Sequence, residues 1–260
     1  MRHLFAVLVA AGCSASAAHH ITTETTDGGT SGSADGQPTG GGGPIALVYR
    51  GPASCAGCAE AAAAVLQAAT FDVHFVGPDE QLKATAETLS VATLYCQPGS
   101  AMSVPDSFDA MSADATAIDA FVHNGGRYLG FADGGYLAGK NPGFQLLPGD
   151  SDSYIASQGA TVTNPDDTVI QIKWRGQPRS VYFQDGPLFV VDAGAQGVEV
   201  LATYDTGAIA ALVAPFGAGK VGVVGPHPEA DLSWYAQYGL VDPDGPDPDL
   251  AFDLINTLMQ

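Results

Sequence analysis

The segment around Ala132 has the pattern of a nucleophile elbow, in which a strand turns sharply into a helix and lifts one side chain above the sheet edge. The apolar run 128–131 leads into a Gly-x-x-x-Gly pattern formed by Gly130 and Gly134. Glycines flank such a turn because a Cβ there would collide with neighbouring backbone. The lifted residue sits at a helix N-terminus, where the dipole stabilises a thiolate or an oxyanion. Here that residue is Ala132, whose methyl group cannot attack a carbonyl.

A second candidate for chemistry is the pair His227 and Glu229, which follows the predicted strand 220–224. In extended backbone, residues two apart point the same way. The imidazole could therefore act as a base that the carboxylate orients, as in a catalytic triad without its first member. A ligand-binding role and a purely structural hydrogen bond between the two side chains remain alternatives.

Asp133 directly follows the lifted position. It could supply a carboxylate to a pocket, or bind a metal together with His227 and Glu229. We expect the plainer role of a carboxylate that complements the helix dipole. We predict no metal and no cofactor.

Cys55 and Cys58 form a Cys-x-x-Cys pattern at a predicted helix start. One interpretation is a redox motif with a lowered thiol pKa. No thioredoxin-like pattern surrounds the pair, and disulfides are common in exported proteins. We expect a structural disulfide, with Cys96 as a buried, unpaired thiol.

The elements that must position these residues alternate between strand and helix in the first half of the chain. We predict strands at 45–49, 71–76, 92–96 and 128–131 and helices at 59–69, 82–89 and 115–123. This alternation favours an α/β fold with a mostly parallel sheet covered by helices on both faces. The second half contains short β-branched and aromatic runs that predict added antiparallel strands, followed by helices at 230–238 and 250–258.

Five short segments, taken in chain order, resemble motifs of one known family. Residues 128–136, which read Tyr-Leu-Gly-Phe-Ala-Asp-Gly-Gly-Tyr, are similar to the Gly-Phe-Cys-x-Gly-Gly-Tyr elbow of the biotin-protein ligase N-terminal domain family. This family belongs to the class I glutamine amidotransferase-like superfamily. The other segments resemble its first loop, its Pro-Gly-Gly loop, its Tyr-x-x-Gly-Gly segment and its Gly-x-His-Pro-Glu end: 49–52, 97–100, 182–187 and 225–229.

The resemblance implies a Cys-His-Glu triad in active relatives. It places Ala132 at the nucleophile position, His227 at the base and Glu229 at the orienting carboxylate. Since a methyl group forms no thioester, hydrolysis by the covalent route is expected to be absent. The resemblance also marks further residues as candidate binding positions: Gly51, Pro52, Gly99, Ser100, Asp133 and Gly134. Since no Gly-Arg-Gly biotin-adenylate motif appears in the sequence, we expect that the chain is not a biotin ligase.

Two main hypotheses for function follow. The first is a nonenzymatic domain that keeps an amidotransferase-like cleft for a small molecule or peptide. The second is a hydrolase that uses Asp133, His227 and Glu229 without a thiol. A third alternative is a subunit that docks on a separate enzyme. A formal charge of −19 argues against a nucleic-acid partner, because acidic surfaces repel phosphate backbones.

The N-terminal residues predict export. Residues 1–13 read as a lipoprotein signal peptide, with Arg2, a short apolar run and small residues before Cys13, the predicted lipidation site. The rival is ordinary cleavage near residues 15–17. Residues 14–44 form a Gly/Ser/Thr-rich flexible linker, and 45–260 form the folded domain. We expect the chain to be anchored by lipid to a membrane of the bacterial cell envelope, on its periplasmic or extracellular face.

Overall fold

The computed structural model describes residues 42–140 and 142–260. The predicted signal segment 1–13, its Cys13 and most of the predicted linker lie outside these residues. Within the described part of the chain, no helix is both long and apolar enough to cross a bilayer.

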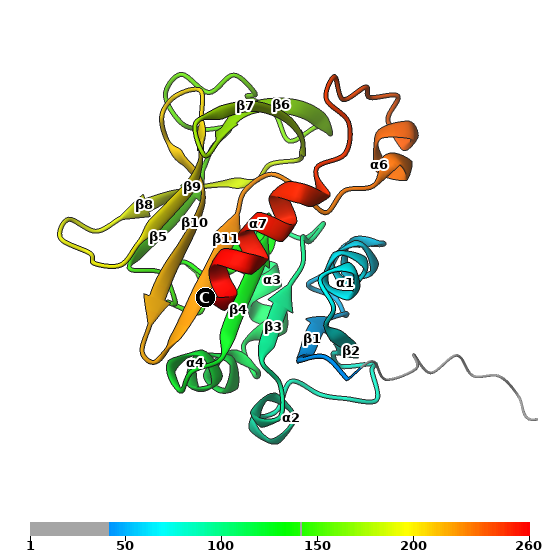
Figure 1. The fold of residues 1–260 in the computed structure, drawn as a ribbon, viewed down its shortest axis with the longest axis vertical. Helices are drawn as coiled ribbons and strands as arrows, with labels where there is room; N and C mark the ends of the chain where they lie inside the picture. Colours follow the sequence, from blue (N-terminus) through cyan, green and yellow to red (C-terminus); the bar gives the residue numbers. More distant parts are fainter. Residues whose placement is uncertain (1–41, 141) are drawn as a thin grey trace, which may run out of the picture. The chain divides into compact units, whose positions relative to one another are not determined.

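In residues 42–140 and 142–260, 11 strands form one mixed sheet in the order β2-β1-β3-β4-β11-β10-β9-β6-β7, with β8 paired to β10 and β5 paired to β8 (Figure 1). The strands are β1 (Ile45–Tyr49), β2 (Asp72–Val76), β3 (Leu94–Gln97), β4 (Arg127–Phe131), β5 (Gly149–Ser153), β6 (Thr168–Trp174), β7 (Gln177–Phe183), β8 (Pro187–Val191), β9 (Glu199–Tyr204), β10 (Ile209–Phe216) and β11 (Gly219–Val224). Strands β2, β1, β3, β4 and β11 run parallel to one another. From β10 onward the pairings are antiparallel.

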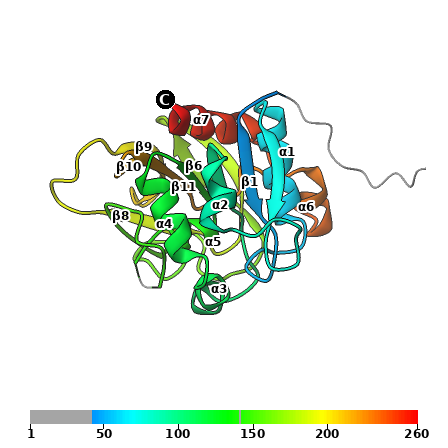
Figure 2. The same cartoon turned by 90° about the horizontal axis from the view of Figure 1, so that it is seen from below.

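Helices cover both faces of the parallel strands. They are α1 (Cys58–Ala68), α2 (Ala86–Ser90), α3 (Val104–Met111), α4 (Ala115–His123), α5 (Asp133–Leu137), α6 (Leu232–Gln237) and α7 (Pro248–Met259). Because side chains alternate along a strand, Ala46 and Val48 of β1 join a core with α1 and α7, whereas Leu47 and Tyr49 join one with α2 to α5. Figures 1 and 2 both show α7 beside α1 on the same face of the sheet.

The fold class predicted from the sequence is confirmed, with differences at some element ends and two elements that were not predicted. The helix expected at 82–89 begins only at Ala86, because the Thr85 hydroxyl accepts the backbone N–H of Thr88 as an N-cap. Likewise, α6 begins at Leu232 because the carboxylate of Asp231 caps it. Helix α3 and strand β5 were not predicted.

The topology brings the candidate residues to one edge of the sheet. Strands β1, β3, β4 and β11 are parallel neighbours, so the loops that follow them emerge at the same edge. In an open α/β sheet, ligands bind outside the carboxyl ends of the strands. This edge receives the Cys-x-x-Cys loop, the loop at Gly99, the turn at Ala132 and the loop at His227.

Candidate functional site

The bend at Ala132 joins β4 directly to α5. Ala132 has φ 46° and ψ −106°, a conformation that a residue with a Cβ rarely adopts. Its backbone N–H donates to the carbonyl of Val224 in β11 (2.9 Å), and its carbonyl accepts the N–H groups of Gly135 (2.8 Å) and Tyr136 (3.1 Å). These hydrogen bonds tie the turn from β4 into α5 to the neighbouring strand β11. They place the Ala132 methyl group above the sheet edge.

The glycines on either side of Ala132 are required by close backbone contacts. A methyl group on Gly134 would stand 2.0 Å from the carbonyl oxygen of Gln97, and one on Gly130 would stand 2.5 Å from the carbonyl oxygen of Gly134. The same Gly134 carbonyl accepts the buried hydroxyl of Tyr128 at 2.7 Å. The Gly-x-x-x-Gly spacing therefore lets α5 pack directly on β3 and β4.

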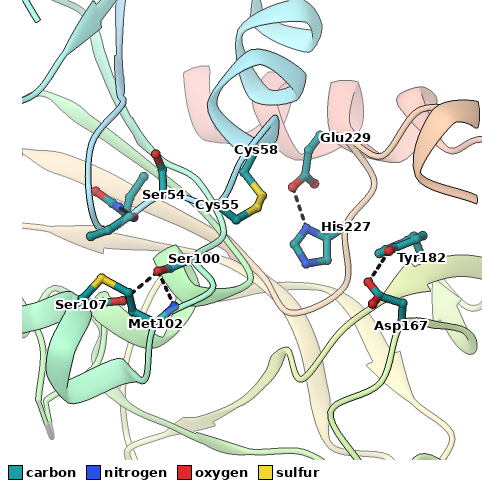
Figure 3. Close-up of a disulfide and its surroundings, with 12 residues drawn as sticks. Ser54, Cys55, Cys58, Ser100, Met102, Ser107, Asp167, Tyr182, His227 and Glu229 are labelled. Carbon is teal, nitrogen blue, oxygen red and sulfur yellow. Dashed lines mark hydrogen bonds and ion pairs between the residues drawn. A yellow bond between two sulfur atoms is a disulfide. The ribbon is translucent and has the colours of Figure 1, made fainter. Parts of the chain in front are cut away.

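His227 and Glu229 form a buried pair beyond the end of β11. A hydrogen bond of 2.8 Å joins Nδ1 of His227 to Oε1 of Glu229, and the two side chains are 4% and 0% exposed (Figure 3). The backbone N–H of His227 donates to the carbonyl of Tyr182 at 2.8 Å. With Nδ1 engaged, Nε2 is the ring nitrogen left for a ligand or a proton.

The elbow and the imidazole meet at Gly99, in the loop after β3. A methyl group on Gly99 would lie 2.9 Å from Cε1 of His227 and 3.7 Å from Cβ of Ala132. The same point is 3.5 Å from Sγ of Cys58. Only a residue without a side chain leaves the space between these three groups open.

A cavity of about 320 Å³ opens at this point. Its lining has no Lys or Arg and is formed by Cys55, Gly99, Ser100, Ala101, Met102, Ser103, Val104, Ala132, Asp133, Tyr136, Pro165, Gln184, Asp185 and His227. The cleft therefore combines two carboxyl groups, an imidazole, hydroxyls and an amide. Among the described residues, no group of three or more His, Cys, Asp or Glu side chains is arranged to hold a metal ion.

Asp133 is the most perturbed carboxyl group of the cleft. Burial raises its pKa from 3.8 to about 7, and the hydroxyl of Ser107 opposes that rise in part. Its Oδ2 is buried without a hydrogen-bond partner among the described protein atoms. A carboxyl group in this state exchanges a proton near neutral pH and is a donor or an acceptor accordingly.

The first half of the folded domain matches a known protein family. Residues 45–152 match the family model described as biotin-protein ligase, N terminal. This stretch is a biotin-protein ligase N-terminal-like segment. The resemblance inferred from the sequence is thereby confirmed for these residues, which include the elbow, while His227 and Glu229 lie beyond the match. No curated protein matches the sequence.

Solved structures show that the whole fold, which includes the biotin-protein ligase N-terminal-like segment, is glutamine amidotransferase-like. A protein from Thermoplasma acidophilum that is named as a GMP synthase subunit is 10% identical, with a TM-score of 0.53 over 82% of this chain and 95% of that one. A glutamine amidotransferase from Methylobacillus flagellatus is 13% identical, with a TM-score of 0.52 over 75% of this chain and 74% of that one. The exo-β-1,4-mannosidase Op5Man5 from Opitutaceae bacterium strain TAV5 is 17% identical (TM-score 0.50), and the match covers 83% of this chain but 36% of the mannosidase. At these identities the likeness concerns the fold alone.

The cleft includes some of the predicted binding residues and not others. Gly99, Ser100 and Asp133 line it, as do Ala132 and His227. Gly134 does not, because it packs beneath the cleft against the Gln97 carbonyl. The turn with Gly51 and Pro52 also lies outside the lining: Gly51 packs against the side chains of Tyr49 and Pro78, and Pro52 is exposed.

One wall of the cleft was not predicted from the sequence, although it lies within the biotin-protein ligase N-terminal-like segment. Residues 101–104 line it and lead into α3. A signal was present, since the Ser103 hydroxyl caps α3 by accepting the N–H of Asp106, and Pro105 follows in the first turn. Cys55 and Pro165 also line the cleft, and no local pattern predicts such long-range contacts.

The packing at the elbow predicts that alanine costs much more stability at Gly134 than at the adjacent Gly135. Gly134→Ala should destabilise the fold by about 3 kcal/mol, because the added methyl group would meet a backbone carbonyl that is fixed in β3. Gly135→Ala is the matched control and should cost about 1 kcal/mol or less, since its nearest neighbours are the side chains of Phe189 and Pro187 at 3.0 and 3.1 Å. Urea unfolding of both variants measures the difference, and equal costs would contradict the packing described.

Because of the raised pKa of Asp133, the stability difference between the native chain and Asp133→Asn should depend on pH. Between pH 4 and 7 the unfolded carboxyl group is ionised while the folded one keeps its proton, so stability is lost as the pH rises towards the folded pKa of about 7. Asp133→Asn removes this loss and should stabilise the chain by about 2 kcal/mol more at pH 8 than at pH 5. Denaturant unfolding at both pH values tests this, with the exposed Asp109→Asn as a control for charge removal. A difference that is constant with pH would show that Asp133 ionises normally.

Proposed function

We propose that the cleft above Ala132 binds a small molecule or peptide without the covalent chemistry of a thiol nucleophile. The observation that carries the proposal is the methyl group at the elbow, in the strained conformation that lifts a side chain towards an imidazole. The bend, the His227–Glu229 pair and the open cavity are all present. A carbonyl compound held there would meet a base but no attacking atom.

The charge of the cleft indicates the class of ligand. Asp133 and Asp185 line it without a Lys or Arg, and each has an oxygen that is buried without a partner. Burial also raises the pKa of Asp185. A ligand with N–H donors or a positive charge would satisfy these oxygens, whereas a phosphate or carboxylate would be repelled. Amines, amides and peptide N–H groups are therefore the preferred chemistry.

A hydrolase that works without a thiol is the second candidate, favoured by the carboxyl group of Asp133. Its pKa of about 7 suits proton transfer near neutral pH, next to the residue where a nucleophile would stand. In this alternative, Asp133 and His227 activate a water molecule. The two candidates differ in whether the native chain turns over a substrate.

Restoring the thiol separates the two candidates. Ala132→Cys should hydrolyse p-nitrophenyl acetate or a glutamine amide about 100-fold faster than the native chain, because removing a nucleophile typically costs orders of magnitude in rate. The double variant Ala132→Cys with His227→Ala is the control and should lose most of the gain. Steady-state kinetics measures all three chains. Turnover by the native chain that His227→Ala abolishes would instead support the hydrolase.

We also propose that the protein is exported and is anchored to a membrane by lipid. The supporting observations are the small residues before Cys13 and the Cys55–Cys58 disulfide, a bond that persists in oxidising compartments. The linker 14–44 would let the domain stand off the membrane.

Lipid anchoring predicts the chemistry of the mature N-terminus. In a bacterial host, the purified chain should begin at an acylated Cys13, and Cys13→Ser should lose both the lipid mass and the membrane fraction. Cys96→Ala, which alters a buried thiol, is the control and should keep both. Mass spectrometry of the N-terminal peptide tests this. A mature chain that begins after residues 15–17 without a lipid would replace the anchor with ordinary secretion.

A further inference from the structure

We propose that the Cys55–Cys58 disulfide is a redox-active group of the cleft, which exchanges with dithiols under proton transfer by His227. This inference does not depend on noncovalent ligand binding. It gives the His227 imidazole a role in proton transfer to and from thiols, because Ala132 provides no nucleophile for it to activate. The sequence favoured a structural disulfide, and the position of the bond in the fold is what argues otherwise.

The disulfide lies inside the site. Cys58 is the first residue of α1, and the backbone N–H of Cys55 donates to the carbonyl of Gly99 at 2.9 Å. Cys58 Sγ and His227 Cε1 both lie within 3.5 Å of the point where a Cβ on Gly99 would stand. Figure 3 shows the sulfur–sulfur bond beside the imidazole, on the side of the ring away from α6. A disulfide that only braced the Cys-x-x-Cys loop would have no need of this position.

The two sulfurs differ in access. Cys55 is partly exposed and lines the cleft, whereas Cys58 is 0% exposed. An incoming thiolate can therefore reach Cys55 and not Cys58. Cys58 is then the leaving sulfur, next to His227 and at the N-terminus of an 11-residue helix, where a thiolate is stabilised.

A second cavity, of about 260 Å³, is also lined by Cys55. It shares Cys55, Ala101 and Gln184 with the cleft and is also lined by Ala56, Asp167, Tyr182, Trp234, Gln237 and Tyr238. Tyr182 donates its hydroxyl to Asp167, and the Trp234 ring lies 5.3 Å from the His227 ring. Three aromatic side chains beside a reachable sulfur favour a dithiol carried on an apolar molecule or a peptide.

The exchange balances as two successive displacements. The thiolate of a dithiol attacks Cys55 Sγ, a new S–S bond forms, and the electron pair of the old bond leaves on Cys58 Sγ. His227 takes the proton of the incoming thiol and passes it to Cys58, with Glu229 holding the imidazolium. The second thiol of the ligand then attacks the mixed disulfide, loses its proton and releases Cys55 as a thiol. Two electrons and two protons move from the dithiol, which becomes a disulfide, to Cys55 and Cys58.

Single-cysteine variants of the full chain test the asymmetry. Cys58→Ser leaves a reachable Cys55, which should form a mixed disulfide with oxidised glutathione at least about tenfold faster than Cys58 does in Cys55→Ser. Peptide mapping by mass spectrometry assigns the adduct and separates it from Cys13 and Cys96. Equal rates, or no adduct on Cys55 in the folded chain, would overturn the proposal.

The role of the imidazole is tested by reducing the native disulfide with dithiothreitol under folding conditions. His227→Ala should slow reduction at pH 7 by about tenfold or more and should change the shape of the pH–rate profile. His74→Ala, which changes an imidazole outside the cleft, is the matched control and should leave both unchanged. Circular dichroism checks that each variant is folded, and Glu229→Gln provides a second, smaller perturbation of the same pair.

The pH profile of the native chain keeps the test decisive if His227→Ala does not fold. Alkylation of the reduced native chain should show Cys55 or Cys58 ionising below the value of about 8.5 for a free thiol. A disulfide that dithiothreitol reduces only on unfolding, or thiols that ionise like free cysteine, would show that the bond is structural.

Discussion

The contact between Gly134 and the carbonyl of Gln97 is the constraint on which the site depends. Only glycine allows α5 to approach β3 this closely, and that approach forces β4 to turn within a single residue. Ala132 absorbs the turn in a backbone conformation that costs about 1–3 kcal/mol in general. The strain is offset by the hydrogen bond that Ala132 donates to β11 and by those that it accepts from the first turn of α5. The sharp bend is therefore present although the side chain at its tip is only a methyl group.

That shape concentrates groups of different chemistry around Gly99. The imidazole, the Ala132 methyl and a disulfide sulfur surround the space where its side chain would be. Since no Lys or Arg lines the cleft, no cation there offsets the burial that raises the pKa of Asp133. The two proposals, noncovalent binding and thiol–disulfide exchange, therefore concern different atoms of the same cleft. In that cleft, the carboxylate of Glu229 accepts a buried hydrogen bond from Nδ1 of His227 and so orients the imidazole.

Local sequence patterns predicted the parts of the site that rest on local geometry. The spacing of Gly130 and Gly134 indicates a sharp turn whatever surrounds it, and the family match over residues 45–152 includes that turn. The alternation of strands and helices gave the parallel sheet, which is confirmed. Loop residues were harder to place: Gly51 and Pro52 have the family's residue types, but they follow β1 at a point that packs on Pro78.

Long-range packing decides what the sequence could not. The pattern Cys-x-x-Cys is the same in a brace and in a redox centre, and only the tertiary contact of Cys55 with Gly99 puts the bond in the cleft. The raised pKa of Asp133 also arises from burial by the folded chain around it, which the local sequence pattern does not show. In both cases the chemistry of the residue depends on a segment distant in the chain.

The Ala132 methyl and the His227 imidazole share one cavity in this structure. A nuclear Overhauser experiment on a chain labelled at alanine methyls and histidine rings tests this arrangement. The structure predicts a cross-peak between the Ala132 methyl and the Hε1 proton of His227, since both carbons border the open space at Gly99. A spectrum in which both signals are assigned and the cross-peak is absent would contradict the account.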